Sequence, residues 1–311
     1  MTQQALPITH INNFYKAPHF LPAYATRERF NLPLFSLYVL LHILALAAPL
    51  TYSWQGLTAL LAMYFLTICL GITLCYHRLL THRSYNTNRA VKYLLTFLGC
   101  LAFQRGPIWW AACHRLHHSK VDKEQDPHSP RYSFIWSHFL WAFFWHPQLD
   151  EEQETTNRLA LDLAGDSGMR FFEKHYTSLN ILCLMALLGL GYLCGGWKIG
   201  FSVLVWGGFL RLVLCLNITW LVNSACHVWG YQTYDTGDRS RNNWWVALLT
   251  WGEGWHNNHH ADARAARNGH RWYEIDPTYW IIQLMRQLGL ANNIVPVRPE
   301  LSMAEPLKSK A

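Results

Sequence analysis

The sequence predicts an all-α integral membrane protein with four transmembrane helices in two hairpins and a helical cap on the cytoplasmic side. Of the 311 residues, 51% are hydrophobic and only 14% are charged, yet the mean hydropathy is +0.01. Apolar and polar blocks must therefore alternate along the chain. Several apolar blocks reach the length of about 20 residues that a helix needs to cross a bilayer.

The four apolar blocks come in two pairs. Residues 32–50 and 55–76 contain no Lys, Arg, Asp or Glu, and residues 178–195 and 199–222 are interrupted only by Arg211. Runs this long and poor in charge favour membrane spans over the core helices of a large soluble protein. The turns within each pair are short, so each pair predicts a helical hairpin.

The distribution of Lys and Arg sets the expected orientation. These residues gather outside the apolar blocks, and the hairpin tips contain only Lys198. The positive-inside rule then places both termini of this multi-pass protein in the cytoplasm. The predicted segments are a cytoplasmic N-terminal segment (1–31), hairpin one (32–76), a first cap region (77–177), hairpin two (178–222), a second cap region (223–295) and a flexible tail (296–311).

Composition also limits the partners. The net charge of +7 suits anionic lipid headgroups, an acidic redox partner or an acidic acyl carrier, and no feature favours nucleic acid. The eight cysteines form no C-x-x-C pair and lie largely in apolar stretches, which argues against a disulfide scaffold.

Nine of the seventeen histidines fall in four clusters on the predicted cytoplasmic side. The nine candidate metal ligands are His77, His82, His114, His117, His118, His227, His256, His259 and His260. An α-helix brings residues three and four apart to one face, so each H-x-x-H-H is expected to present its imidazoles to one side. Asn223 lies four residues before His227 and could hold a metal-bound water. His77 and His82 are five apart, so that segment is expected to bend or unwind.

Nine imidazoles exceed the coordination shell of one ion, so two metal ions are expected. The nitrogen-rich set allows zinc, copper or iron. A redox-active pair beside a long apolar slot suits activation of O₂ for attack on an unactivated C–H bond, which iron performs and zinc does not. We therefore expect two iron ions as the cofactor, with O₂ as a cosubstrate.

The clusters resemble the histidine boxes of Δ9-type membrane acyl desaturases, over residues 33–291. The resemblance is closest to bacterial and cyanobacterial members, which implies a multi-pass protein of a bacterial inner membrane. The matching stretches are HRLLTHRSY (77–85), HRLHH (114–118), NSACHVWGY (223–231) and GEGWHNNHH (252–260). The resemblance implies four spans, a cytoplasmic diiron cap and a bent acyl tunnel. It assigns the tunnel lining to Gln104, Trp110, Thr219 and Trp220, and the closed far end to Phe65 and Cys69, for which simple interhelical packing is an alternative.

The acyl carrier is left open by the sequence. Where animal acyl-CoA enzymes hold the coenzyme A head, this chain has Arg105, Ala112 and Cys113. Chains on coenzyme A, acyl carrier protein or a membrane lipid are all considered, with Arg105 as the candidate contact for the head. Glu253 and Asp126 are candidates for carboxylates that orient ligand histidines, although a solvated surface acid is an equal alternative.

The expected function is O₂-dependent formation of a cis double bond in a fatty acyl chain. No fused haem domain is visible, so electrons are expected from a separate ferredoxin or cytochrome b5-like protein with its reductase. A diiron acetylenase or hydroxylase is the alternative within the same chemistry. A membrane metal transporter and a non-catalytic partner with a structural zinc site are more remote alternatives, because the histidines lie outside the spans and a closed zinc shell would not need Asn223.

Overall fold

The computed structural model describes residues 20–302, and almost all of its regular structure is helical. The helices are α1 (Leu32–Ala45), α2 (Trp54–Tyr64), α3 (Arg89–Cys100), α4 (Pro107–Lys120), α5 (Phe134–His138), α6 (Gln153–Leu159), α7 (Leu161–Ala164), α8 (Ser167–Val203), α9 (Arg211–Ser224), α10 (Trp244–Leu249), α11 (His256–Ala261), α12 (Pro277–Gln287) and α13 (Pro299–Ser302). One short antiparallel pair departs from the all-α prediction, in which β1 (Asn86–Thr87) is bonded to β2 (Ala291–Asn292).

Polar side chains start many of these helices. The side chains of Asn31, Ser53, Asn88, Asp166 and Asp276 accept hydrogen bonds from backbone N–H groups in the first turns of α1, α2, α3, α8 and α12. Such N-caps satisfy amides that have no partner within the helix. The helices of the first two apolar blocks therefore begin directly after a polar capping residue, Asn31 and Ser53.

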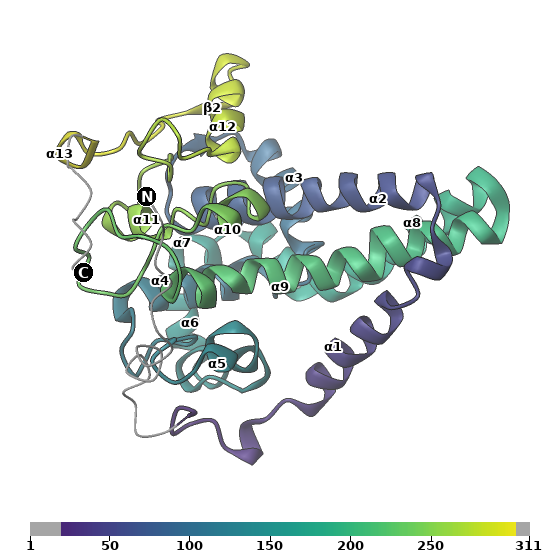
Figure 1. Ribbon diagram of the computed structural model, residues 1–311, viewed down its shortest axis with the longest axis horizontal. Helices are drawn as coiled ribbons and strands as arrows, with labels where there is room; N and C mark the ends of the chain where they lie inside the picture. The colour runs from purple at the N-terminus through teal and green to yellow at the C-terminus, as the bar shows by residue number, and fades with distance from the viewer. Residues whose placement is uncertain (1–19, 303–311) are drawn as a thin grey trace, which may run out of the picture.

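Within residues 20–302, two helical segments are long and apolar enough to cross a membrane, Trp54–Thr81 and Ser167–His227. The first joins α2 to a π-helix, Phe65–Thr81. The second contains α8, a shorter π-helix (Leu204–Leu210) and α9, and non-helical dihedral angles at Gly195 and Gly196 divide it. The chain reverses there, so the part of α8 before Gly195 lies antiparallel to α9 (Figure 1).

The first predicted span is shorter than expected. Helix α1 has 14 residues and gives way to turns before the 3₁₀ segment Pro49–Thr51. Proline lacks the N–H that would continue the helical bonding, which explains why the helix does not run on to residue 50. By itself α1 does not reach the length of about 20 residues that spans a bilayer.

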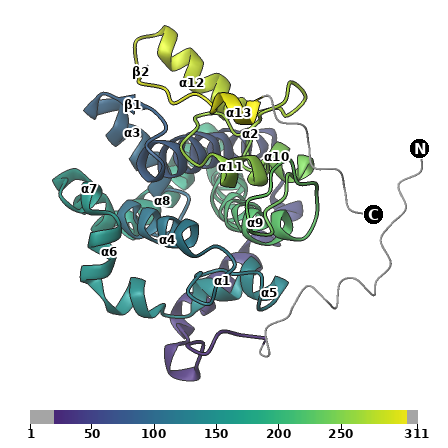
Figure 2. The same ribbon diagram turned by 90° about the vertical axis from the view of Figure 1, so that its left-hand side faces the viewer.

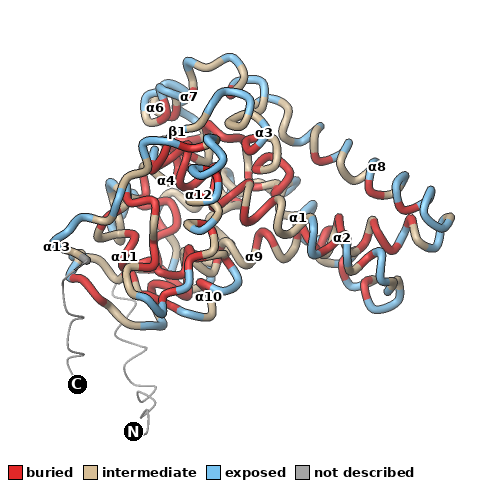
Figure 3. Tube along the Cα trace, turned by 90° about the horizontal axis from the view of Figure 1, so that it is seen from above, coloured by how far each residue is buried: buried red, intermediate tan, exposed pale blue. Residues whose placement is uncertain are grey.

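The cap occupies one end of the helical bundle and the hairpin tips occupy the other (Figure 1). Buried residues concentrate in the cap, whereas the tip end of α8 is largely exposed (Figure 3). The main hydrophobic core contains residues of the π-helix Phe65–Thr81, α3, α4 and α12. The π-helix and α3 cross closely, because a Cβ on Gly71 would lie 2.6 Å from the backbone nitrogen of Gly99.

The described part of the predicted flexible tail is attached to the cap. The backbone N–H of Arg298 donates to Asp262, and the hydroxyl of Tyr234 donates to the carbonyl of Leu301. The rest of the predicted tail and of the N-terminal segment, residues 303–311 and 1–19, lies outside the described residues.

Candidate metal centre and acyl cavity

The structure gathers all nine predicted histidines into two adjacent groups at the cap end of the bundle. Figure 2 looks onto this end, where α4, α11 and α9 lie around a common centre. The five-histidine group consists of His77, His82, His114, His118 and His259, and the four-histidine group consists of His117, His227, His256 and His260. The candidate ligand atoms within each group lie within 4.8 Å of one another.

His77 and His82 meet because their segment is a π-helix. The sequence predicted a bend or an unwound stretch between them, and that expectation was wrong. The backbone N–H of His82 donates to the carbonyl of His77 at 3.1 Å, which is the i→i+5 bond of a π-helix. Residues five apart therefore share a face, and the two rings lie 4.7 Å apart.

Each H-x-x-H-H motif contributes to both groups. In α4, His114 and His118 join the five-histidine group, whereas His117 joins the four-histidine group. In α11 the pattern is reversed, since His256 and His260 belong to the second group and His259 to the first. The pair four residues apart stays together because it stacks along one side of the helix, and the third imidazole leans toward the neighbouring group.

The nitrogen–nitrogen distances fit shared cations. Nε2 of His259 lies 3.2 Å from Nε2 of His77 and 3.0 Å from Nε2 of His118. A neutral imidazole nitrogen has either one hydrogen or one lone pair, so His259 cannot form hydrogen bonds to both. Two imidazole nitrogens bound at right angles, about 2.1 Å from one ion, would be about 3.0 Å apart. A common ion bound between these nitrogens would account for both contacts.

The same spacing recurs in the four-histidine group. Nε2 of His227 lies 3.1 Å from Nε2 of His256. Burial, reinforced by the mutual repulsion of protonated neighbours, lowers the pKa of six imidazoles outside the helices Trp54–Thr81 and Ser167–His227 well below the ordinary 6.5. This holds for His82, His114, His117, His118, His256 and His259. Neutral imidazole is the form that binds a metal, so these residues fit the role.

Carboxylates lie behind the histidines. Asp126 accepts a hydrogen bond from Nδ1 of His117 at 2.9 Å, and an oxygen of Glu253 lies 2.8 Å from Nδ1 of His77. The structure thus brings both predicted acids to the expected places. Burial raises the pKa of Asp126 to about 6.

Sequence reasoning missed two further carboxylates. Asp238 lies 2.9 Å from Nδ1 of His260, and Asp122 lies 3.6 Å from Nδ1 of His227. Asp122 could have been suspected, because it stands four residues before Asp126 and four after His118. No pattern in the sequence points from Asp238 to His260, because an irregular loop brings them together.

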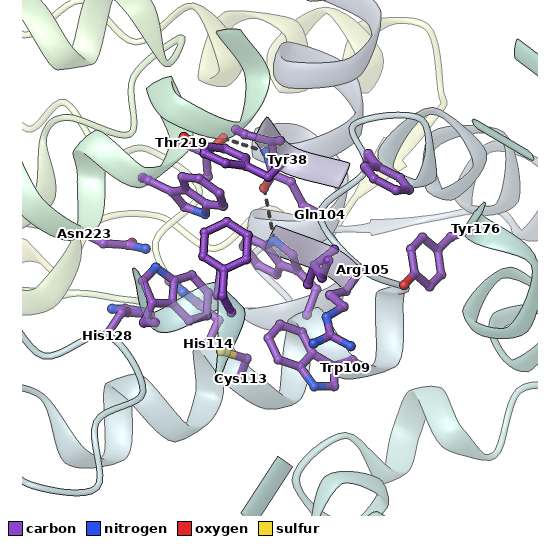
Figure 4. A pocket seen from close by; sticks show the side chains of 18 of the residues that line it. Tyr38, Gln104, Arg105, Trp109, Cys113, His114, His128, Tyr176, Thr219 and Asn223 are labelled. Carbon is purple, nitrogen blue, oxygen red and sulfur yellow. Dashed lines mark hydrogen bonds between the residues drawn. The ribbon is translucent and has the colours of Figure 1, made fainter. Parts of the chain in front are cut away.

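An apolar cavity, with about 900 Å³ of empty space that includes open solvent, reaches His114 of the five-histidine group. Figure 4 shows Asn223, His114 and His128 at one end of it, and Arg105 and Trp109 toward the other. Helix α1 contributes much of the wall, through Leu34, Leu37, Tyr38 and Leu41. His128, which is not among the nine expected ligands, is buried, and its Nδ1 lies 3.7 Å from a carboxylate oxygen of Asp126.

The predicted tunnel residues separate into two sets. Gln104, Trp110, Thr219 and Trp220 all line the cavity. The amide of Gln104 donates to the hydroxyl of Thr219 at 2.9 Å and accepts from the indole of Trp110 at 3.4 Å. These bonds hold the cavity wall together across α4 and α9.

Phe65 and Cys69 are not brought to this cavity. Phe65 packs edge-on against Trp251 at 5.4 Å between ring centroids. Cys69 is fully buried, with its sulfur 3.9 Å from the hydroxyl of Thr278. The positions of Phe65 and Cys69 fit the alternative that these side chains serve interhelical packing.

Arg105, the candidate contact for the acyl carrier, lines the cavity among aromatic and acidic neighbours. Its guanidinium lies 4.8 Å from the ring centroid of Trp109 and 5.5 Å from that of Trp145. One of its nitrogens is 3.7 Å from Asp150. The site therefore combines a cation, indole faces and a carboxylate.

Two adjacent groups of histidines that could hold metal ions, one of which borders an apolar cavity through His114, fit an enzyme that acts on a hydrophobic substrate. The family model described as fatty acid desaturase matches residues 52–291, and the chain belongs to this family. It is a fatty acyl desaturase and therefore an oxidoreductase.

Several relatives cover most of the chain. It is 45% identical over 256 residues to the sn-1 stearoyl-lipid 9-desaturase of Anabaena variabilis, which covers 82% of this chain and 90% of the relative. It is 42% identical over 260 residues to the sn-2 palmitoyl-lipid 9-desaturase of Nostoc sp. (strain 36), which covers 83% of this chain and 88% of that relative. It is also 43% identical over 254 residues to an acyl-CoA 5-desaturase of Anemone leveillei, which covers 82% of this chain and 76% of that relative.

Proposed function

We propose that this protein introduces a cis double bond at the Δ9 position of an acyl chain attached to a membrane lipid. The observation that carries the proposal is that the five-histidine group borders the apolar cavity through His114, with the four-histidine group directly beside it. The names of the Anabaena and Nostoc relatives support a lipid-linked chain, and the Anemone relative is named for an acyl-CoA substrate.

The nine histidines would hold two iron ions, and Asn223 would hold a water on one of them. When bound, the iron pair would supply the activation of O₂. Two adjacent methylenes would lose one hydrogen each, and these two hydrogens, with two electrons and two protons from outside, would reduce O₂ to two waters. The chain's own task is to hold neutral imidazoles in place and to position the acyl chain. Asp126 and Glu253 orient His117 and His77 from behind.

The cavity residues would position the acyl chain. Trp110 and Trp220 present flat apolar surfaces, and the bonds of Gln104 to Thr219 and Trp110 stiffen the wall near the histidines. A stiff wall holds one pair of methylenes near the metal site, since a small displacement costs much of the rate. Arg105 would contact the polar head of the substrate at the cavity.

The same proposal includes a four-span topology in a bacterial inner membrane with both termini in the cytoplasm. It is supported by the reversal at Gly195 and Gly196, and by the basic residues gathered at the end opposite the hairpin tips. Helix α1 with its following turns would form the first span. Electrons would come from a separate ferredoxin or cytochrome b5-like protein with its reductase.

The proposal is tested by the products formed in a bacterial host that lacks desaturases. Expression of the wild-type chain should yield Δ9-unsaturated acyl groups in membrane lipid, and the His260→Ala variant should yield none while still inserting into the membrane. Purified protein should then be compared on matched phospholipid, glycolipid, acyl-CoA and acyl carrier protein substrates. Failure to form an unsaturated product on any carrier would refute the function, and hydroxylated or acetylenic products would replace it with a related one.

Metal analysis gives a second, independent measurement. Protein purified without oxygen from iron-replete cells should contain two irons per chain. Zinc in place of iron would favour a structural zinc site and count against oxidative chemistry.

A further inference from the structure

Arg78 follows a candidate ligand, His77, directly in the chain and is almost fully buried, with 1% of its surface exposed. Its guanidinium donates to two carboxylates at once. Nε and Nη2 each donate to Oε1 of Glu253 at 3.1 Å, while Nη1 and Nη2 donate to the two oxygens of Asp276 at 2.9 Å. Nη1 also donates to the carbonyl of Ala266 at 2.7 Å. A buried arginine with this many bonds is held in one orientation.

Glu253 connects this arginine to the metal centre. Its Oε1 accepts from Arg78, and its Oε2 lies 2.8 Å from Nδ1 of His77. The amide of Asn268 donates to the same Oε2 at 2.8 Å. Because one oxygen faces Arg78 and the other faces His77, the position of the arginine determines how the carboxylate meets the imidazole.

Asp276 fixes the other side of the arginine. It accepts hydrogen bonds from the backbone N–H groups of Asn268 and Tyr279, the second of which caps α12. Gly252 leaves no room for a side chain here, because its φ is +119° and a Cβ would lie 2.5 Å from Asp276 and 3.1 Å from Arg78. Arg78 therefore connects three parts of the cap. It lies on the π-helix that contains His77, and it bonds to the loop before α11 through Glu253 and to the start of α12 through Asp276.

The four-histidine group is supported differently. Asp126 accepts from the backbone N–H groups of Asp122 and His128, and Asp238 accepts from that of Ser240. Backbone donors thus hold these carboxylates. A change at Arg78 should consequently reach the five-histidine group through Glu253 and His77 and leave the other group in place.

We propose that Arg78 is a positioning residue for the metal ion of the five-histidine group, acting through Glu253 on His77. This inference rests on the proposed diiron function. Residues that orient a ligand histidine typically contribute about 10- to 100-fold to metal affinity or activity. Loss of the guanidinium would also leave Glu253 and Asp276 buried together without their cation, which is costly.

The test compares iron content and Mössbauer spectra of full-length protein, purified without oxygen and loaded with ⁵⁷Fe. The variants His82→Ala and His227→Ala first assign the spectral components to the two groups, since each removes a histidine from one group only. Arg78→Gln should then bind iron about 10- to 100-fold more weakly in the five-histidine group. At an iron concentration that just saturates the wild-type protein, its content should fall from two irons toward one, with loss of the component that His82→Ala also loses.

Two further variants separate positioning from folding. Arg78→Lys keeps the charge but cannot bond both carboxylates in the same way, so it should show the same selective loss to a smaller extent. Arg211→Gln is a matched control, because Arg211 is also a fully buried arginine and bonds to backbone carbonyls of Gly207 and Leu101. It should lower thermal stability yet keep both irons and wild-type spectra in the folded fraction.

The coupling to Glu253 can be measured directly. If Arg78 acts through this carboxylate, Arg78→Gln combined with Glu253→Gln should lose no more iron affinity than Glu253→Gln alone. Two irons with wild-type spectra in folded Arg78→Gln or Arg78→Lys would overturn the inference, as would equal loss from both groups. An iron-free wild-type protein would instead refute the proposed function itself.

Discussion

Removal of the metals should make the cap sensitive to mild acid. The six site histidines with lowered pKa stay neutral in the fold, whereas in the unfolded chain they take up protons near pH 6.5. The unfolded state then binds more protons, so stability is full above pH 6.5 and falls as the pH drops below it. Between pH 6.5 and 5.5 each of these histidines lowers the free energy of unfolding by at most about 1 kcal/mol, and all six together lower it by at most about 6 kcal/mol.

A loss of that size is comparable with the whole stability of an ordinary domain, about 5–15 kcal/mol. Chelator-treated protein in detergent should therefore lose its cap tryptophan fluorescence and near-ultraviolet circular dichroism between pH 6.5 and 5.5. The iron-loaded protein is the control, and its transition should lie at lower pH because protons must also displace the metal. Equal thermal midpoints of the metal-free protein at pH 7.5 and 5.5 would refute the assignment of these histidines as buried and neutral.

Three further substitutions test other parts of the site. Asn223→Ala should reduce turnover more than iron content, measured by product yield and metal analysis, because it removes a water-holding amide but no imidazole. Leu41→Trp fills part of the cavity wall and should shift the product profile in gas chromatography toward shorter acyl chains; an unchanged profile would remove α1 from the substrate path. Gly252→Ala forces a Cβ against Asp276 and a strained φ of +119°, so it should cost about 1–3 kcal/mol in thermal unfolding.

The sequence predicted which histidines come together and that residues 55–76, 178–195 and 199–222 lie in long apolar helices, because both depend on local patterns. A helix places residues three and four apart together, and the motifs at 114–118 and 256–260 follow that rule. The division of each motif between two groups was not predictable, because it depends on how α4 and α11 approach each other. The π-helix around His77 was missed for a related reason, since its wider turn is not distinguished from an α-helix by composition.

Contacts made by loops were also beyond the sequence. Asp238 reaches His260 across 22 residues, and Arg78 reaches Asp276 across 198. No helical or strand periodicity relates residues that are this far apart in the sequence, so these contacts are seen only in the folded chain. The short α1 was the reverse case, in which apolar composition suggested a longer helix than Pro49 permits.

The arrangement of charge explains how an apolar substrate and a metal centre can share one site. The carboxylates of Asp126, Glu253 and Asp238 contact the Nδ1 side of their histidines, while the short contacts between imidazoles are made by Nε2. The cavity lining includes none of these acids. An acyl chain can therefore approach the histidines without desolvating a carboxylate, a step that would cost several kcal/mol. The acids can orient the imidazoles and offset the metal charge from behind, and this separation keeps the cavity apolar up to its end.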